Sequence, residues 1–126
     1  MYLVDTSALL ALRKGIPSIG NRIKQITEGE HLIIASPSVF ELLDGATKNE
    51  FEKTELLLSQ SEVLPLTYEA AHLSAKLSNQ LKKSGKTVSK MDLFIAAIAL
   101  EHNLQLITLD TDFQRIPNLK AVIIKS

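Results

Sequence analysis

Short apolar runs of strand length alternate along the chain with longer stretches in which apolar residues recur every three or four positions. The runs occupy residues 2–4, 32–35, 62–66, 104–109 and 121–124. A recurrence of three to four residues is typical of helices with one buried face. Strands that alternate with helices predict a parallel sheet covered on both faces. We therefore expect an α/β fold, namely a three-layer α/β/α sandwich with a parallel sheet of about five strands.

The strand order follows from a central position for the first strand. The second and third strands then lie on one side and the fourth and fifth on the other, which gives the order 3-2-1-4-5. Pro65 suits an edge strand, because proline cannot donate to the ladder. Residues 93–100 are apolar without interruption, which predicts a buried helix. In this order Asp5 and Asp110, which follow the first and fourth strands, face each other at the carboxyl edge of the sheet, where ligands bind.

Composition narrows the class of protein. The 126 residues fit one domain, 1–126, with 45% hydrophobic and 22% charged side chains. The chain has no cysteine, which excludes disulfides and thiolate metal sites and suits a reducing cytoplasm. No secretory signal or membrane-spanning apolar stretch is visible, so we expect a cytoplasmic protein without membrane contact. Lys plus Arg number 14, as do Asp plus Glu, which argues against a bulk polyanion binder but not against local contacts.

Acidic residues stand at the predicted junctions between strands and helices. The candidates are Asp5, Glu41, Asp92 and Asp110, with Asp112 close behind. Each also has a purely structural explanation. Asp5 suits the positive end of a helix dipole, and Asp110 or Asp112 can cap a short helix.

The spacing from Ser38 to Glu41 and from Ser89 to Asp92 matches that of a capping box. Taken one at a time, the acids are therefore explained by helix capping at least as well as by function.

Asp92 favours the functional explanation over helix capping. Its helix is buried almost to its start, and no Lys or Arg is obviously placed to pair with its carboxylate. Carboxylates gathered without cations raise one another's pKa values, and a divalent cation resolves that conflict. Oxygen ligands alone favour Mg²⁺ or Mn²⁺ over Zn²⁺. Such a site suits phosphoryl chemistry. The hydroxyls of Thr6 and Ser7 are candidates to orient a carboxylate or a water molecule of the metal shell.

Four segments of the chain resemble, in the same order, the four signature segments of PIN-domain ribonucleases, particularly the VapC-type toxins. They are LVDTSAL at 3–9, SPSVFEL at 36–42, DLFIAA at 92–97 and ITLDTDF at 107–113. The resemblance spans most of the chain. It implies a metal-dependent endoribonuclease that cleaves RNA, forms a homodimer and is restrained by a small antitoxin protein. By position, Asp5, Glu41, Asp92 and Asp110 match the acidic quartet, and Thr6 matches its hydroxyl.

The fourth segment departs from the commonest form of the family, because Leu109 stands where Asn or Arg often precedes the acid. This leaves open whether Asp110 or Asp112 lies nearer the metal. The place of RNA is also open, since Lys82, Lys83, Lys86 and Lys90 can face phosphates or simply be solvated.

Other functions fit less well. A phosphoaspartate-forming phosphatase would need an acid at position 7, where the chain has Ser7, and a phosphoreceiver domain would need one after the third strand. No G-x-S-x-G motif or glycine-rich phosphate loop occurs. The serious alternative is a non-catalytic PIN-like module that binds RNA or a protein.

Overall fold

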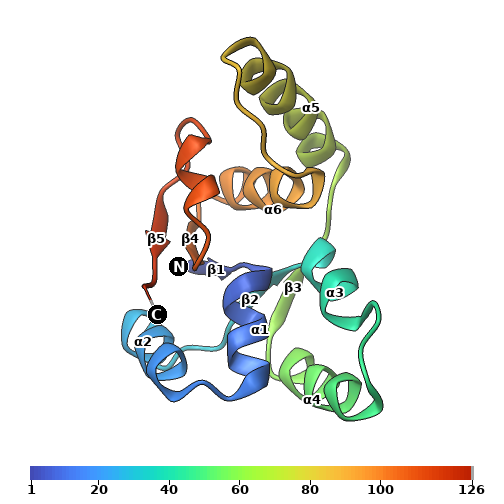
Figure 1. Cartoon of the computed structure of the whole chain (residues 1–126), viewed down its shortest axis with the longest axis vertical. Coiled ribbons are helices and arrows are strands. Elements are labelled where there is room, and N and C mark those ends of the chain that lie inside the picture. Colours follow the sequence, from blue (N-terminus) through green and yellow to red (C-terminus); the bar gives the residue numbers. More distant parts are fainter. Residues whose placement is uncertain (126) are drawn as a thin grey trace.

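The computed structural model describes residues 1–125 and confirms the three-layer α/β/α arrangement (Figure 1). Five parallel strands pair in the order β3-β2-β1-β4-β5, as expected from the sequence. The strands are β1 (Tyr2–Val4), β2 (Ile33–Ala35), β3 (Glu62–Leu64), β4 (Gln105–Thr108) and β5 (Ala121–Ile123). The central position of β1 places the residue that follows it in the middle of the carboxyl edge.

Six α-helices and one short 3-10 helix connect the strands. Their bounds are α1 (Thr6–Lys14), α2 (Pro17–Thr27), α3 (Ser36–Leu43), α4 (Lys48–Ser59), α5 (Tyr68–Lys83), α6 (Lys90–Glu101) and η1 (Thr111–Arg115). Two separate apolar cores show how they divide between the faces of the sheet. One core is formed with α5, α6 and η1, and the other with α1 to α4.

Alternate strand residues feed these two cores. Leu3 and Leu106 pack with α5 and α6, whereas Val4 and Ile107, their immediate neighbours, pack with α1 and α2. All four side chains are fully buried. Because successive side chains of a strand point to opposite faces, a sheet covered on both sides needs apolar residues at every position. This explains why the strands are continuous apolar runs.

Helix ends follow local rules with one exception. Thr67 and Ser89 cap α5 and α6 by accepting hydrogen bonds from backbone N–H groups, and Thr47 forms a capping box with Glu50 at the start of α4. The capping box suggested by the spacing of Ser38 and Glu41 does not form. The reason is that α3 already begins at Ser36, directly after β2, so Ser38 lies inside the helix.

The helix α4 is more exposed than its apolar residues suggest. Phe51 is 44% exposed and Leu56 is 62% exposed, while Leu57 and Leu58 are partly buried against the core. Within residues 1–125, none of the helices combines the length and apolar character that a membrane span requires.

We predict that Leu106→Ala, which truncates a fully buried side chain in the core beneath α5 and α6, lowers the free energy of unfolding by about 2–5 kcal/mol. Leu56→Ala is the matched control and should change it by no more than about 0.5 kcal/mol, because most of that side chain is already in water. Urea denaturation measures both. Equal losses in the two variants would contradict the assignment of β4 to the core.

Candidate active site

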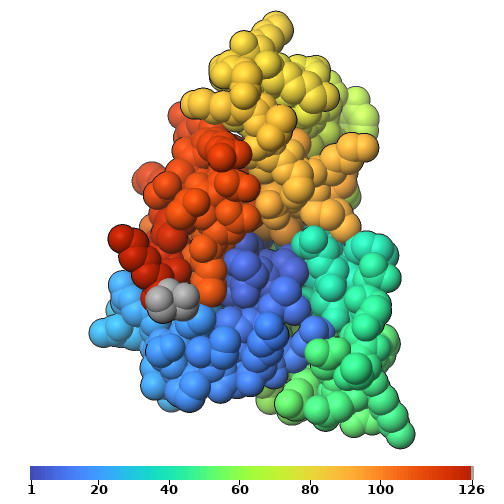
Figure 2. Space-filling model, in the orientation of Figure 1, coloured from blue at the N-terminus to red at the C-terminus, as the bar shows by residue number. Residues whose placement is uncertain are grey.

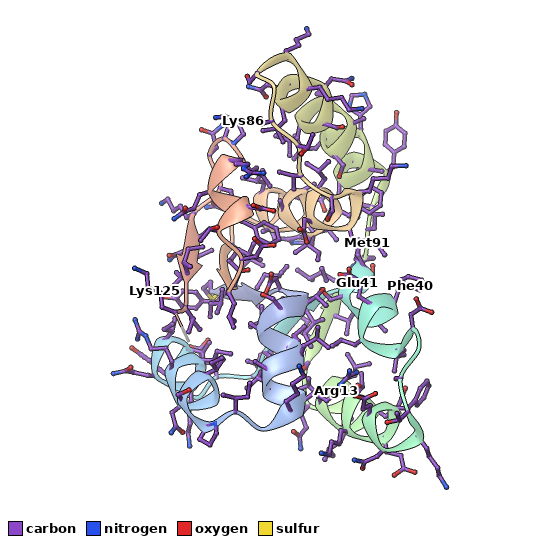
Figure 3. All side chains as sticks on the ribbon, viewed as in Figure 1. Arg13, Phe40, Glu41, Lys86, Met91 and Lys125 are labelled. Atoms are coloured by element: carbon purple, nitrogen blue, oxygen red, sulfur yellow. The ribbon has the colours of Figure 1, made fainter. Side chains whose placement is uncertain are left out.

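The structure brings the four predicted acids to the carboxyl edge of the sheet. Asp5 follows β1 directly, and Asp110 lies just after β4. Glu41 belongs to α3, which begins where β2 ends, and Asp92 lies in the first turn of α6. The helices α3 and α6 are in contact, and Figure 3 shows Glu41 on the side of α3 that faces Met91 at the start of α6.

Asp5 is the most buried of the four, with 2% of its surface exposed. Its carboxylate accepts hydrogen bonds from the Ala8 N–H at 3.0 Å, the Ser7 hydroxyl at 2.8 and 3.0 Å, and the Thr108 hydroxyl at 2.6 Å. The three donor groups supply one hydrogen each, and the carboxylate can accept about four hydrogen bonds. About one lone-pair direction is therefore left for another ligand. Asp5 is thus both the N-cap of α1 and a candidate ligand.

Two hydroxyls connect Asp5 to the segment that carries Asp110. The Thr108 hydroxyl accepts from the Asp110 N–H at 2.9 Å, and the Ser7 hydroxyl accepts from the Leu109 N–H at 3.0 Å. Each hydroxyl then donates its hydrogen to Asp5. Ser7 thus contacts a carboxylate, which is one of the two roles that the sequence left open for its hydroxyl. Thr108 escaped sequence reasoning, although a hydroxyl two residues before an acid at a strand end was the available signal.

Glu41 is held from α1. The Thr6 hydroxyl donates to a Glu41 carboxylate oxygen at 2.6 Å and lies 2.9 Å from the Ser38 hydroxyl. Ser38 is fully buried and forms this contact instead of a helix cap. Thr6 therefore links the start of α1 to Glu41 and Ser38 of α3, and its role at a site stays a prediction.

The pKa values of Asp5 and Asp92 are raised above the ordinary value of an aspartate. Burial is the largest cause that raises the pKa of Asp5 above its ordinary value; hydrogen bonds from Thr108, Ala8 and Ser7 lower it, and the charge of Asp110 adds to the rise. Burial also raises the pKa of Asp92 to about 6, a hydrogen bond with Ser89 opposes this, and the charges of Asp110, Asp5 and Glu41 raise it further. The charges of Asp5, Glu41 and Asp110 therefore all reach Asp92.

The geometry distinguishes Asp110 from Asp112. Asp110 caps η1 by accepting from the Asp112 N–H at 2.9 Å, and its charge raises the pKa values of both Asp5 and Asp92. Asp112 instead pairs with Arg115 at 3.4 Å. Asp110 is thus the acid whose charge reaches the others.

The charges and donor atoms of this group fit a hard divalent cation. None of the ion pairs within residues 1–125 involves Asp5, Glu41, Asp92 or Asp110, so these acids have no cationic partner there. Their oxygen atoms are the ligands that Mg²⁺ and Mn²⁺ prefer. In the same residues no three Asp, Glu or His side chains stand close enough to enclose an ion.

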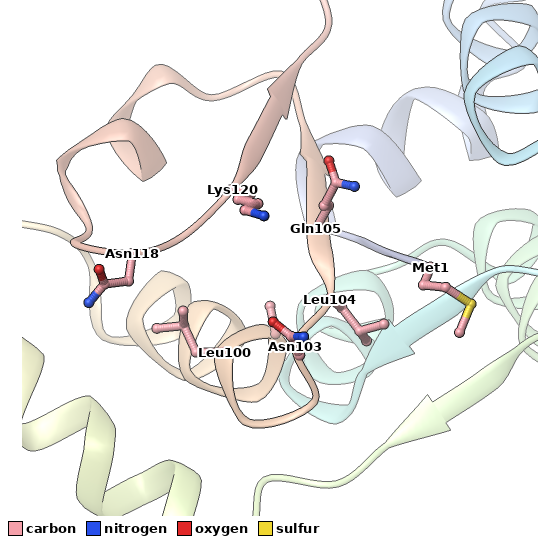
Figure 4. A pocket seen from close by; sticks show the side chains of 8 residues that line it. Met1, Leu100, Asn103, Leu104, Gln105, Asn118 and Lys120 are labelled. Carbon is pink, nitrogen blue, oxygen red and sulfur yellow. The ribbon is translucent and has the colours of Figure 1, made fainter.

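A separate cavity of about 220 Å³ lies at the other end of the sheet (Figure 4). It is bounded by Met1 before β1 and Gln105 at the start of β4, and Lys120 is its charged lining residue. No acid of the candidate site borders it. Ligands of parallel sheets bind at the carboxyl ends of the strands, so this cavity is not part of the candidate site.

Comparison with known proteins places these features in context. The family model described as PIN domain matches residues 2–119. Ribonuclease VapC1 of Haemophilus influenzae (strain R2866) is 32% identical over 127 residues, which cover 95% of each chain. The structure of VapBC-1 from nontypeable Haemophilus influenzae is similar with a TM-score of 0.82 at 30% identity, covering 97% of this chain and 96% of that one. VapBC2 from Rickettsia felis, bound to a promoter DNA fragment, has a TM-score of 0.86 at 24% identity, covers 98% of each chain, and supports the fold alone.

We predict that Asp92→Asn stabilises the metal-free protein at high pH. The pKa of Asp92 is about 6 in the folded state and 3.8 ordinarily, so the folded state binds this proton more tightly. The associated stability is present below pH 4 and is lost as the pH rises through 6. Asparagine stays neutral, so unfolding by urea in EDTA should cost roughly 1 kcal/mol more at pH 8, after allowance for solvent screening of a half-exposed group.

The same substitution should have little effect at pH 4. Asp44→Asn, at an exposed residue after α3, is the control and should behave alike at both pH values. A loss of stability at pH 8 in Asp92→Asn would show that the charged form is favourable in the fold.

We also predict that Thr108→Val lowers the free energy of unfolding by about 1–3 kcal/mol, because it removes a donor to Asp5 and leaves the Asp110 N–H without its acceptor. Thr108→Ser keeps the hydroxyl and should lose less. The control is Thr27→Val in α2, whose buried hydroxyl donates at 2.9 Å to the Ile23 carbonyl of the same helix. If Thr27→Val costs as much as Thr108→Val, the bridge between Asp5 and Asp110 has no special weight.

Proposed function

Because the chain belongs to the PIN-domain family, we propose that it is a metal-dependent endoribonuclease and the toxin of a toxin–antitoxin pair. The observation that carries the proposal is the group of four carboxylates at one edge of the sheet, in which neighbouring acids raise the pKa values of Asp5 and Asp92 and none of the four has a cationic partner within residues 1–125. Relatives named as VapC ribonucleases support it over nearly the whole length of the chain. We propose that residues 1–126 form one nuclease domain.

The proposed metal ligands are Asp5, Glu41, Asp92 and Asp110, and the proposed ion is Mg²⁺ or Mn²⁺. The chemistry that such an ion supplies is neutralisation of phosphodiester charge and acidification of a water molecule. The chain's own residues prepare the ligands. Ser7 and Thr108 orient Asp5, and Thr6 orients Glu41. Asp112 remains a secondary candidate, because its ion pair with Arg115 competes for the carboxylate.

The proposed macromolecular partners are RNA, a small antitoxin protein and a second copy of the chain. Solved relatives are VapBC complexes, which supports the antitoxin. Exposed apolar side chains support protein contacts, since large apolar groups in water favour association. They include Phe40, which is 58% exposed and points outward from α3 in Figure 3, and Tyr68, which is 80% exposed.

The non-catalytic alternative explains the site less well. A module that only binds RNA or protein has no need for four carboxylates whose mutual repulsion opposes folding. Neutral caps such as Ser or Asn would serve α1 and η1 equally well.

We predict that the purified protein cleaves RNA with Mg²⁺ or Mn²⁺ and that Asp5→Asn or Asp92→Asn reduces the rate by at least about 100-fold, since loss of a ligand costs more than loss of an outer-shell partner. Asp110→Asn should cost more than Asp112→Asn. Asp44→Asn is the control with wild-type activity. Gel analysis of a labelled RNA measures the rates, and a melting scan with millimolar Mn²⁺ measures binding.

Absence of cleavage with either ion, or equal cleavage by wild type and both Asn variants, would overturn the enzymatic proposal. A melting temperature that Mn²⁺ leaves unchanged would contradict the metal site separately from the activity.

A further inference from the structure

The charges of this neutral chain are segregated along the molecule. Between Ala70 and Met91 the sequence contains five lysines and no Asp or Glu. Four of these lysines form the lysine segment, which spans the end of α5, the loop that follows and the start of α6. They are Lys82, Lys83, Lys86 and Lys90. Figure 2 shows this part of the chain at one end of the long axis, with α4 toward the other end.

The four lysines are exposed, and within residues 1–125 none of them forms an ion pair. The region of α4 has the opposite character. Residues 44–62 contain five acids and two lysines. The region of α4 and the lysine segment therefore carry opposite net charges, and the lysine segment is free to bind an external anion.

Three features connect the lysine segment to the elements that carry Asp92 and Asp110. Lys90 begins α6 two residues before Asp92. A shallow groove of about 50 Å³ has Lys82 and Lys86 on its wall together with Leu93, the residue after Asp92. The Arg115 guanidinium, in the short helix that follows Asp110, donates to the Thr87 carbonyl at 2.9 Å. The segment is thus anchored to the elements that carry two of the four acids.

We propose that the lysine segment, with Arg115 at its border, binds the phosphodiester backbone of single-stranded RNA and leads it to the four carboxylates. This inference rests on the proposed nuclease function. A polyanion that approaches four carboxylates is repelled, and a neighbouring row of ammonium groups offsets that repulsion. Residues between the lysines are Ser84, Gly85, Thr87, Val88 and Ser89. They offer no aromatic ring for stacking, so contact with the backbone gives affinity without base selection.

The test is RNA binding in EDTA, which separates binding from cleavage. Three proteins are titrated against a labelled oligouridylate of about 16 nucleotides. They are the wild type, the Glu triple variant (Lys82→Glu, Lys83→Glu and Lys86→Glu together) and the Gln triple variant with glutamine at the same three positions. Fluorescence anisotropy is recorded from about 50 to 200 mM KCl. The charge-matched control reverses three exposed lysines elsewhere, Lys24, Lys48 and Lys125, and circular dichroism melting checks that every variant folds.

We expect the Glu triple to weaken binding by at least 10-fold at low salt and the Gln triple by less. In the Glu triple, the slope of the logarithm of the RNA association constant against the logarithm of the KCl concentration should become shallower. Each RNA phosphate that loses its lysine contact contributes about 0.7 to this change, so three phosphates contribute about 2. The control triple should keep the wild-type slope.

Equal weakening by the control triple would show a general charge effect and overturn the proposal, as would RNA binding that is unchanged in the Glu triple or absent in wild type. If the lysine substitutions weaken binding of polyglutamate but not of RNA, the lysine segment binds an acidic protein, and the RNA proposal is overturned. Lysine-dependent RNA binding without cleavage under Mg²⁺ or Mn²⁺ supports the lysine segment and refutes the nuclease proposal. Cleavage without lysine dependence does the reverse.

Discussion

Burial of the Asp5 carboxylate is the constraint on which the rest of the site depends. The residue follows the central strand, so neighbouring elements cover it on all sides and leave 2% of its surface exposed. A charge in that position is costly unless donors replace the lost water. The donors are the Ala8 N–H and the hydroxyls of Ser7 and Thr108, which come from the start of α1 and the end of β4. Satisfying one carboxylate thereby fixes β1, α1 and β4 relative to one another.

Helix capping and the candidate chemistry use the same atoms. Asp5 and Asp110 are the N-caps of α1 and η1, and both residues lie at the edge of the sheet where a cation would bind. The N-termini of these helices place partial positive charge beside the two carboxylates. Local stability and function are therefore not alternatives for these two residues.

The charge of Asp92 opposes folding at neutral pH. The pKa of Asp92, raised to about 6, shows that its charged form is disfavoured by burial and by three neighbouring carboxylates. Local rules are broken most often where function requires it, and this arrangement is consistent with the ligand site proposed above. The lysine segment lies outside this cluster and pairs with no acid within the described residues, so it keeps its charge for an external partner.

The sequence by itself determined the class of fold, the strand order and the identity of the four acids. Continuous apolar runs such as 106–107 require a sheet covered on both faces, and short-range signals such as Thr67 and Ser89 specify where helices begin. These properties depend on neighbours along the chain, so they can be predicted from the pattern. The exposure of Phe51 and Leu56 could not, because it depends on how far α4 lies from the sheet.

Only the tertiary structure decided how the acids are held. Thr108 donates to a carboxylate 103 positions away, and Thr6 contacts Glu41 and Ser38 across more than 30 positions. No local pattern encodes such pairs, because a hydroxyl acquires its partner only when the strands and helices are assembled. The influence of Asp110 on Asp5 and Asp92 arises in the same way, because its charge reaches them only in the assembled fold, whereas the pair of Asp112 with Arg115 lies three residues apart in one short helix.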